Sequence, residues 1–227
     1  MNLLAIDSAG AACSACVCRD GRIVASAYTD GVLDHSRTLL CKIKDALKQS
    51  CLKPDELDKI ALTTGPGSFT GIKIGIATAK GLAFKNNIPC SAVSSLEALA
   101  DGVKLFEGTI FAVMDARRGQ LYNAVFEASA GILRRLTPDR QIKADELTAQ
   151  IKGKALAVGD GAAILARKCA ENGLDIMLAP PRLSMIHAES VAQLALGGAG
   201  TDTEPDKLTA SYLRLPQAER QRLGLSD

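Results

Sequence analysis

The sequence predicts an α/β protein made of two similar halves, and two observations support this prediction. An apolar strand that ends in an aspartate occurs twice, at residues 3–7 and 110–115, and the copies lie about half the 227-residue chain apart. Each copy is followed by a second strand, a turn and, later, amphipathic helices. A repeat of this length indicates two related units, each combining a β-meander with helices.

Composition excludes several classes of protein. Hydrophobic residues make up 47% of the chain and charged residues 23%, which predicts a packed core rather than disorder. The net charge of +2 is too balanced to predict nucleic-acid or membrane binding from charge alone. No apolar run reaches about 18 residues. The apolar segment at residues 1–6 has no basic residue before it and ends at Asp7. We therefore expect no membrane span and no secretory signal, and a cytoplasmic protein with reduced cysteines.

The first half begins with an antiparallel meander. Its three strands are predicted at residues 3–6, 11–18 and 23–29. The Asp-Gly pair at positions 20–21 is typical of a hairpin turn between the last two strands. Cys13 and Cys16 form a C-x-x-C pattern that could bind a metal or act in redox chemistry. Such motifs normally lie at a helix start, so we favour the interpretation as small apolar strand residues.

Two long helices follow, separated by a strand at residues 60–64. Apolar residues recur at helical spacing from Leu39 to Cys51, and either Asp34 or Ser36 can cap this first helix. The order helix, strand, glycine-rich loop, helix is typical of a right-handed crossover. Part of the sheet is therefore expected to be parallel.

The glycine-rich loop reads TTGPGSFTGIKIG over residues 63–75 and leads into the second helix, at residues 70–84. It could cradle a phosphate, because backbone N–H groups at a helix start attract anions. However, its glycine spacing does not fit the G-x-x-x-x-G-K-[ST] pattern, and Pro66 removes one donor. The alternative is a stiff turn in which Ser68 or Thr70 caps the helix. The helix has apolar residues on most of its faces, so we expect other parts of the structure to cover it on more than one side.

The second half repeats this organisation. A strand at residues 91–93 and a short helix capped by Ser94 lead to a charged, glycine-containing stretch at 101–107, where we place the boundary. Further strands are predicted at 110–115, 121–126 and 155–158, and helices at 162–172 and 188–196. We expect residues 1–104 to form an N-terminal lobe with the partner-binding helices. Residues 105–227 are expected to form a C-terminal lobe whose last residues pack back on the first.

Asp7 and Asp115 end the matching strands of the two halves. Carboxylates placed in this way could hold a metal ion and phosphates in a cleft between the lobes. The alternative is that each aspartate caps its own turn. The only two histidines, His35 and His187, do not have metal-ligand spacing. The arginine pair at 117–118 could contact RNA phosphates or stay solvated.

Several segments together resemble the TsaB family, also called YeaZ, of the bacterial tRNA threonylcarbamoyladenosine machinery. They read LLAIDSAGAACSACV, DHSRTLL, GPGSFTGIKIGIATAKGLA, VMDARRGQLYNAVF and ASYLRLPQAE. The resemblance spans residues 3–219, and its Gly-Pro-Gly-Ser-Phe-Thr-Gly motif is specific. It implies an actin-like, two-lobed ATPase fold in which a ribonuclease H-like unit is duplicated.

The resemblance also implies a non-catalytic role. The family supports the catalytic subunit TsaD, which transfers threonylcarbamoyl to adenosine 37 of tRNA, and helps to recruit the ATPase TsaE. In TsaD a strand leads into a His-x-x-x-His metal motif, whereas Ser95 and Leu99 stand at the matching positions here. Leu cannot ligate a metal and Ser is a poor ligand. We therefore expect no catalytic residue, no metal site and no required cofactor in this chain, with ATP and Mg²⁺ entering only through the assembled complex.

The resemblance further implies that the two long helices pack against TsaD, or against a second copy in a homodimer when the chain is alone. tRNA is then met through the complex. The interface residues that we expect are His35, Leu39, Ile43, Ile72, Ile74, Thr78 and Leu82. Gly71 and Gly75, four residues apart, would permit the close approach of another backbone.

An alternative function is an actin-fold ATPase or small-molecule kinase that uses Asp7 and Asp115 with Mg-ATP. The residues after Asp7 mildly disfavour it, because Ser-Ala-Gly stands there instead of the Gly-Thr pair typical of phosphate loops in those kinases.

Overall fold

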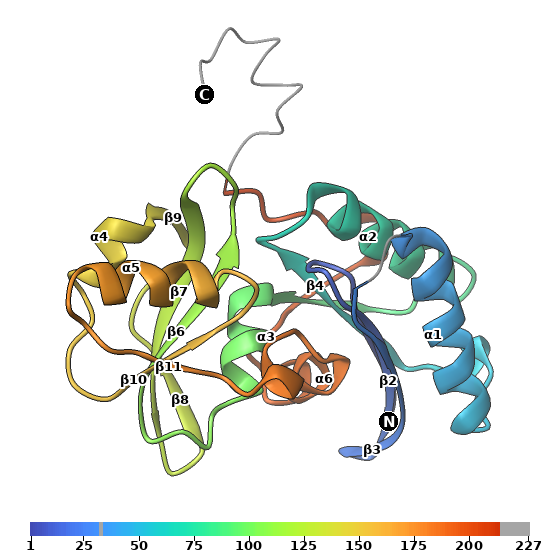
Figure 1. Cartoon of the computed structure of the whole chain (residues 1–227). Helices are drawn as coiled ribbons and strands as arrows, with labels where there is room; N and C mark the ends of the chain where they lie inside the picture. The colour runs from blue at the N-terminus through green and yellow to red at the C-terminus, as the bar shows by residue number, and fades with distance from the viewer. Residues whose placement is uncertain (32–33, 214–227) are drawn as a thin grey trace, which may run out of the picture.

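The computed structural model describes residues 1–31 and 34–213, which form two sheets that stand side by side (Figure 1). The first sheet has the strand order β12-β5-β4-β1-β2-β3. Its strands are β1 (Asn2–Asp7), β2 (Cys13–Arg19), β3 (Arg22–Thr29), β4 (Lys59–Gly65), β5 (Cys90–Ser94) and β12 (Thr201–Thr203). β1 pairs antiparallel with β2 and parallel with β4. Both the meander and the parallel crossover predicted from the sequence are confirmed.

The second sheet repeats the first. It has the order β11-β10-β6-β7-β8, with β9 also paired to β7. Its strands are β6 (Gly108–Asp115), β7 (Gln120–Ser129), β8 (Ile132–Arg135), β9 (Arg140–Lys143), β10 (Ala155–Val158) and β11 (Met177–Leu178). β6 pairs antiparallel with β7 and parallel with β10, as β1 does with β2 and β4. This duplicated ribonuclease H-like order confirms the two-lobed actin-like fold.

Helices form three layers around the sheets (Figure 1). They are α1 (His35–Gln49), α2 (Phe69–Ala83), α3 (Ser95–Asp101), α4 (Ala144–Thr148), α5 (Ala162–Glu171) and α6 (Ala188–Leu196). α1 and α2 cover the outer face of the first sheet, α3 and α6 lie between the sheets, and α4 and α5 cover the second sheet. Side chains alternate along β1, so Leu3 enters the core between the sheets while Leu4 packs under α1 and α2. None of the helices in the described part of the chain has the length and hydropathy needed to cross a bilayer.

The cysteine pattern of β2 is a strand feature, as predicted. Cys13 and Cys16 are three residues apart, so their side chains point to opposite faces of the sheet and enter different cores. Both are buried free thiols, and burial raises the pKa of Cys13 to about 12. The strand geometry therefore prevents these two thiols from sharing a metal ion or a disulfide.

The glycine-rich loop is a turn held against the turn that follows β1. Ser68 caps α2 by accepting a hydrogen bond from the N–H of Gly71 at 3.2 Å, and its own N–H donates to the carbonyl of Ala9 at 2.7 Å. The hydroxyl of Ser8 donates to the carbonyl of Gly71 at 2.9 Å. A Cβ on Gly71 would lie 2.0 Å from the Ser8 carbonyl oxygen, so only glycine lets the two backbones approach this closely. The glycine stripe therefore admits a backbone of this same chain.

The last described residues pack on the N-terminal half (Figure 1). β12 pairs with β5, and Lys80 Nζ donates to the carbonyl of Asp206 at 3.0 Å. The N–H of Ser211 donates to the end of β4 at 2.8 Å, and the rings of Tyr212 and Phe69 pack with centroids 5.1 Å apart. This segment supplies part of the cover that the apolar sequence of α2 requires. The boundary between the two lobes stays a prediction.

Replacing two glycines of α2 by alanine tests the close approach. Gly71→Ala is expected to lower the free energy of unfolding by about 2 kcal/mol or more, because the new methyl group collides with the Ser8 carbonyl. Gly81 has open space around it, so Gly81→Ala is expected to leave stability unchanged or to raise it by up to about 1 kcal/mol. Urea unfolding of both variants checks this, and equal effects at the two positions would contradict it.

Candidate functional site

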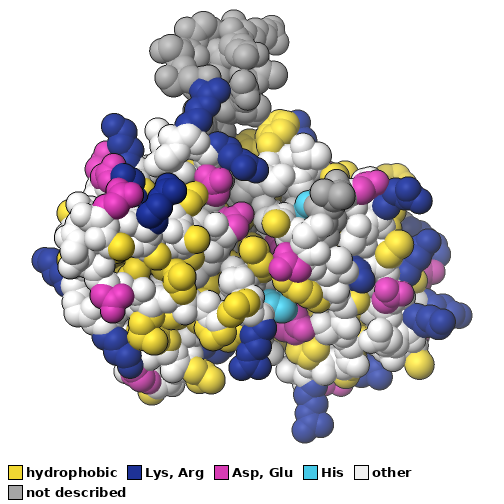
Figure 2. Space-filling view, viewed as in Figure 1, with side chains coloured by type: hydrophobic (Ala, Val, Ile, Leu, Met, Phe, Trp, Pro, Cys, Tyr) yellow, Lys and Arg dark blue, Asp and Glu magenta, His cyan; other side chains and the backbone are white. Residues whose placement is uncertain are grey.

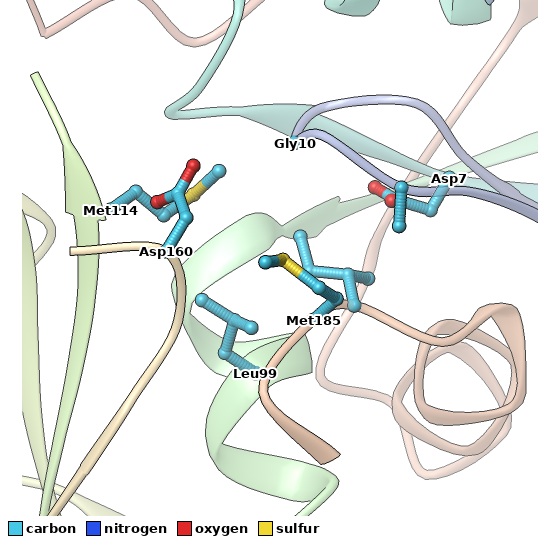
Figure 3. A pocket seen from close by; sticks show the side chains of 8 residues that line it. Asp7, Gly10, Leu99, Met114, Asp160 and Met185 are labelled. Atoms are coloured by element: carbon cyan, nitrogen blue, oxygen red, sulfur yellow. The ribbon is translucent and has the colours of Figure 1, made fainter. Parts of the chain in front are cut away.

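The cleft between the lobes is narrow, and its wall is mostly apolar (Figure 3). It is lined by Asp7, Gly10, Ala12, Leu99, Met114, Asp160, Met185 and Ile186. About 10 Å³ of water-accessible space is open in it, which is roughly the room of one water molecule. Sites for small-molecule ligands typically measure several hundred Å³. The pocket that these residues line is therefore much smaller than such a site in this conformation.

Asp7 ends β1 at this cleft and is only 1% exposed. Its Oδ1 accepts hydrogen bonds from the hydroxyl of Thr63 at 2.5 Å and from the N–H of Ala9 at 3.2 Å. Its Oδ2 is buried without a partner among the described residues. Burial raises the pKa of Asp7 to about 6, although the hydrogen bonds from Thr63 and Ala9 act in the opposite direction. A buried carboxylate repels phosphate unless a cation neutralises it, so a phosphate role for Asp7 would need a bound metal ion.

Asp115 caps its own turn, which is the alternative that the sequence left open. Its Oδ1 accepts a hydrogen bond from the N–H of Arg117 at 2.7 Å, and the Arg117 guanidinium lies 3.6 Å from Oδ2. Its own N–H donates to Oδ1 of Asp160 at 2.9 Å. Asp160 shares the lining of the cleft with Asp7, and Asp115 does not belong to that lining. Sequence reasoning missed Asp160, and the glycine turn at residues 159–161 was the available signal.

Ser95 and Leu99 are the two positions at which the family resemblance implies histidines in TsaD, and neither is a good metal ligand. Leu99 lies in the cleft wall. Ser95 is fully buried, and its hydroxyl has no partner among the described residues. Within the described part of the chain, no group of three or more His, Cys, Asp or Glu side chains is arranged to hold a metal ion.

A cluster of charged and polar side chains fixes α3 against the second lobe. Arg135 of β8 pairs with Glu97 at 2.7 Å and with Asp139 at 2.6 Å. Ser94, which caps α3, donates to Asp139 at 2.7 Å. The Arg135 guanidinium also lies over the ring of Phe126, 4.7 Å from its centroid. These contacts hold α3, and with it the cleft wall that α3 contributes, in one position.

Helices α1 and α2 offer a second candidate site on the outside of the molecule. Three side chains expected at a partner interface, Leu39, Ile43 and Ile72, are 2% exposed or less. These three fill the chain's own core and are covered before any partner arrives, and their expected place at a partner interface stays a prediction. The other four remain partly exposed: His35, Ile74, Thr78 and Leu82.

The exposed side chains of the two helices form a surface that we call the outer helix face. Its residues are Arg37, Leu40, Cys41, Lys44, Asp45 and Lys48 of α1, and Lys73, Ala77, Gly81 and Phe84 along α2 and at its C-cap. Phe84 is 87% exposed and Leu40 46%, so this face carries large apolar side chains that a partner could cover. Sequence reasoning missed these residues because it chose the apolar periodic positions, which the helices bury.

Comparisons with known proteins bear on this fold and site. The family model described as TsaD, tRNA N6-adenosine threonylcarbamoyltransferase, matches residues 29–197. The chain is 35% identical over 154 residues to the tRNA threonylcarbamoyladenosine biosynthesis protein TsaB of Bacillus subtilis (strain 168), which covers 68% of this chain and 67% of the relative. It is 33% identical over 167 residues to the TsaB protein of Escherichia coli (strain K12), which covers 71% and 72%. The solved structure of YeaZ from Pseudomonas aeruginosa has a TM-score of 0.79 at 26% identity, and the match covers 93% of this chain and 99% of that one.

The buried carboxylate of Asp7 predicts a pH-dependent stability. Its pKa is about 6 in the folded chain against 3.8 for an ordinary aspartate, so the folded state binds more protons between these values. The contribution of Asp7 to stability is therefore greatest below about pH 4 and falls by about 3 kcal/mol as the pH rises past 6.

Asp7→Asn cannot titrate and tests this directly. The free energy of unfolding of the variant minus that of the natural chain is expected to rise with pH between about 4 and 6, by up to about 3 kcal/mol. Urea unfolding at several pH values measures this difference. The exposed Asp175→Asn controls for the loss of one negative charge. A difference that stays constant across this pH range would contradict the prediction.

Proposed function

Because the chain belongs to the TsaB family of tRNA threonylcarbamoyladenosine biosynthesis proteins, we propose that it is the non-catalytic subunit of the complex that modifies adenosine 37 of tRNA. In this role it binds and supports the catalytic subunit TsaD and helps to recruit the ATPase TsaE. The assembled complex, rather than this chain, binds tRNA, ATP and Mg²⁺, and it works in the cytoplasm. The observation that carries the proposal is Leu99 in the cleft wall, where the catalytic relative needs a metal ligand.

We assign the docking of TsaD to the outer helix face. Two neighbouring helices that expose apolar and small side chains can complete a four-helix bundle with a second helix pair. Ala77 and Gly81 lie four residues apart on the exposed side of α2, and nothing lies within 4 Å of the position that a Cβ on Gly81 would take. A partner helix can therefore approach α2 closely here. When TsaD is absent, the same face pairs two copies of this chain.

A long charged side chain on this part of α2 should block docking without disturbing the fold. Ala77 is exposed, so Ala77→Arg is expected to leave stability nearly unchanged and to weaken TsaD binding at least tenfold, or by about 1.4 kcal/mol. Size-exclusion chromatography with light scattering measures the complex. Ile74→Glu is a less clean test, because Ile74 packs against the chain's own core.

Ala163→Arg is the matched control, because Ala163 is an exposed alanine on α5 of the second lobe. We expect this variant to bind TsaD as the natural chain does. Normal complex formation by Ala77→Arg, or an equal loss in both variants, would count against docking at the outer helix face.

A further inference from the structure

The outer helix face lies on two helices that are rich in basic residues, although the whole chain is nearly neutral. α1 and α2 contain six Lys or Arg residues and one acidic residue, Asp45, whereas the whole chain carries a net charge of only +2. The six basic residues are Arg37, Lys42, Lys44, Lys48, Lys73 and Lys80. The N-cap of α1, Asp34, adds a second acid. Figure 2 shows Lys and Arg side chains along the edge of the molecule that α1 forms.

An exposed ridge of α1 carries more basic than acidic side chains, although Asp45 lies beside Lys44 on it and the N-cap Asp34 attracts Arg37. Arg37, Lys44 and Lys48 follow one another at intervals of seven and four residues, which places them on one side of the helix. None of the three forms a salt bridge with another described residue. Lys85, just beyond α2, differs because it pairs with Asp55 at 2.6 Å. The ridge therefore presents positive charge to whatever docks on it.

We propose that the outer helix face selects a protein partner whose docking surface is acidic, and that the same charges oppose pairing of the chain with itself. This rests on the proposed function, because it takes the outer helix face as the surface that meets TsaD. In a two-fold homodimer the face meets its own copy, so Lys44 and Lys48 approach further basic side chains. Against an acidic helix pair the same side chains attract the partner. Charge therefore shifts the balance from the homodimer to the heterodimer.

The apolar side chains among these charges favour a protein partner over RNA. Leu40 lies two residues before Lys42 and four before Lys44 on α1. Phe84, at the C-cap of α2, has 87% of its surface exposed. Phosphate contacts would leave such side chains in water, whereas a helix pair can bury them in the centre of an interface. The net charge of the chain adds little general attraction to nucleic acid.

The two complexes are expected to respond to salt in opposite directions. Raising the ionic strength shortens the Debye length from about 10 Å at 0.1 M to about 3 Å at 1 M. Screening should weaken the heterodimer with TsaD several-fold, because it removes attraction. It should strengthen the homodimer several-fold, because it removes repulsion. Sedimentation equilibrium of the chain alone and titration with TsaD over this range of salt measure the two dissociation constants.

Charge reversal on the ridge identifies the residues responsible. The double variant Lys44→Glu, Lys48→Glu is expected to bind TsaD at least tenfold more weakly at low salt and to form its homodimer more tightly than the natural chain. Lys143→Glu with Lys152→Glu reverses two exposed charges on the second lobe and should change neither constant. Circular dichroism confirms that both variants fold.

Three outcomes would overturn the inference. The first is a complex with TsaD that still forms but whose affinity changes neither with salt nor on charge reversal at Lys44 and Lys48. That result would leave the proposed function in place. Another is a homodimer that weakens as salt rises. The third is loss of tRNA binding by the reversed variant with unchanged TsaD binding, which would assign the ridge to RNA. Failure of the natural chain to bind TsaD at any salt concentration would instead remove the proposed function, and the inference with it.

Discussion

The contact between the Ser8 carbonyl and Gly71 determines how the N-terminal half is arranged. A Cβ on Gly71 would lie only 2.0 Å from the Ser8 carbonyl oxygen. The turn after β1 therefore packs directly against the first turn of α2. One consequence is that Asp7 is buried at the end of β1, beside the cleft between the lobes. A second consequence concerns the orientation of α2. Because Gly71 and Gly75 face the turn after β1, Ala77 and Gly81 face outward. The close approach of Ser8 to Gly71 therefore affects both candidate sites, the cleft and the outer helix face.

These two sites differ in what they can do. The cleft lies between the two sheets, where Leu99 and two methionines fill its wall, and the contacts of Arg135 hold α3 in place. The outer helix face is open and basic, and it carries exposed apolar side chains. This difference between the two sites is the basis on which we propose a partner-binding role for this member of the TsaB family.

Much of this fold could be predicted from sequence, because long elements leave a clear period. The three strands of the first meander, β6, β7 and helices α1, α2, α5 and α6 were found in this way, whereas β8, β9, β11 and β12 have only two to four residues and show no period. The sites were harder to predict. Apolar spacing identifies the buried side of a helix, so it pointed to Leu39 and Ile43 when the exposed neighbours Leu40 and Lys44 form the surface. Asp160 reaches the cleft only because β10 pairs with β6, a long-range contact that a single sequence does not reveal.

The central claim is that the outer helix face is covered when TsaD binds, and the cysteines of α1 test it most directly. Cys41 lies within this face and is exposed, and Cys51, just beyond the C-cap of α1, is exposed as well. Alkylation of the two thiols can be followed by mass spectrometry with and without TsaD. We expect TsaD to slow the reaction of Cys41 markedly relative to that of Cys51. An assembled complex in which Cys41 reacts as fast as in the isolated chain would contradict it.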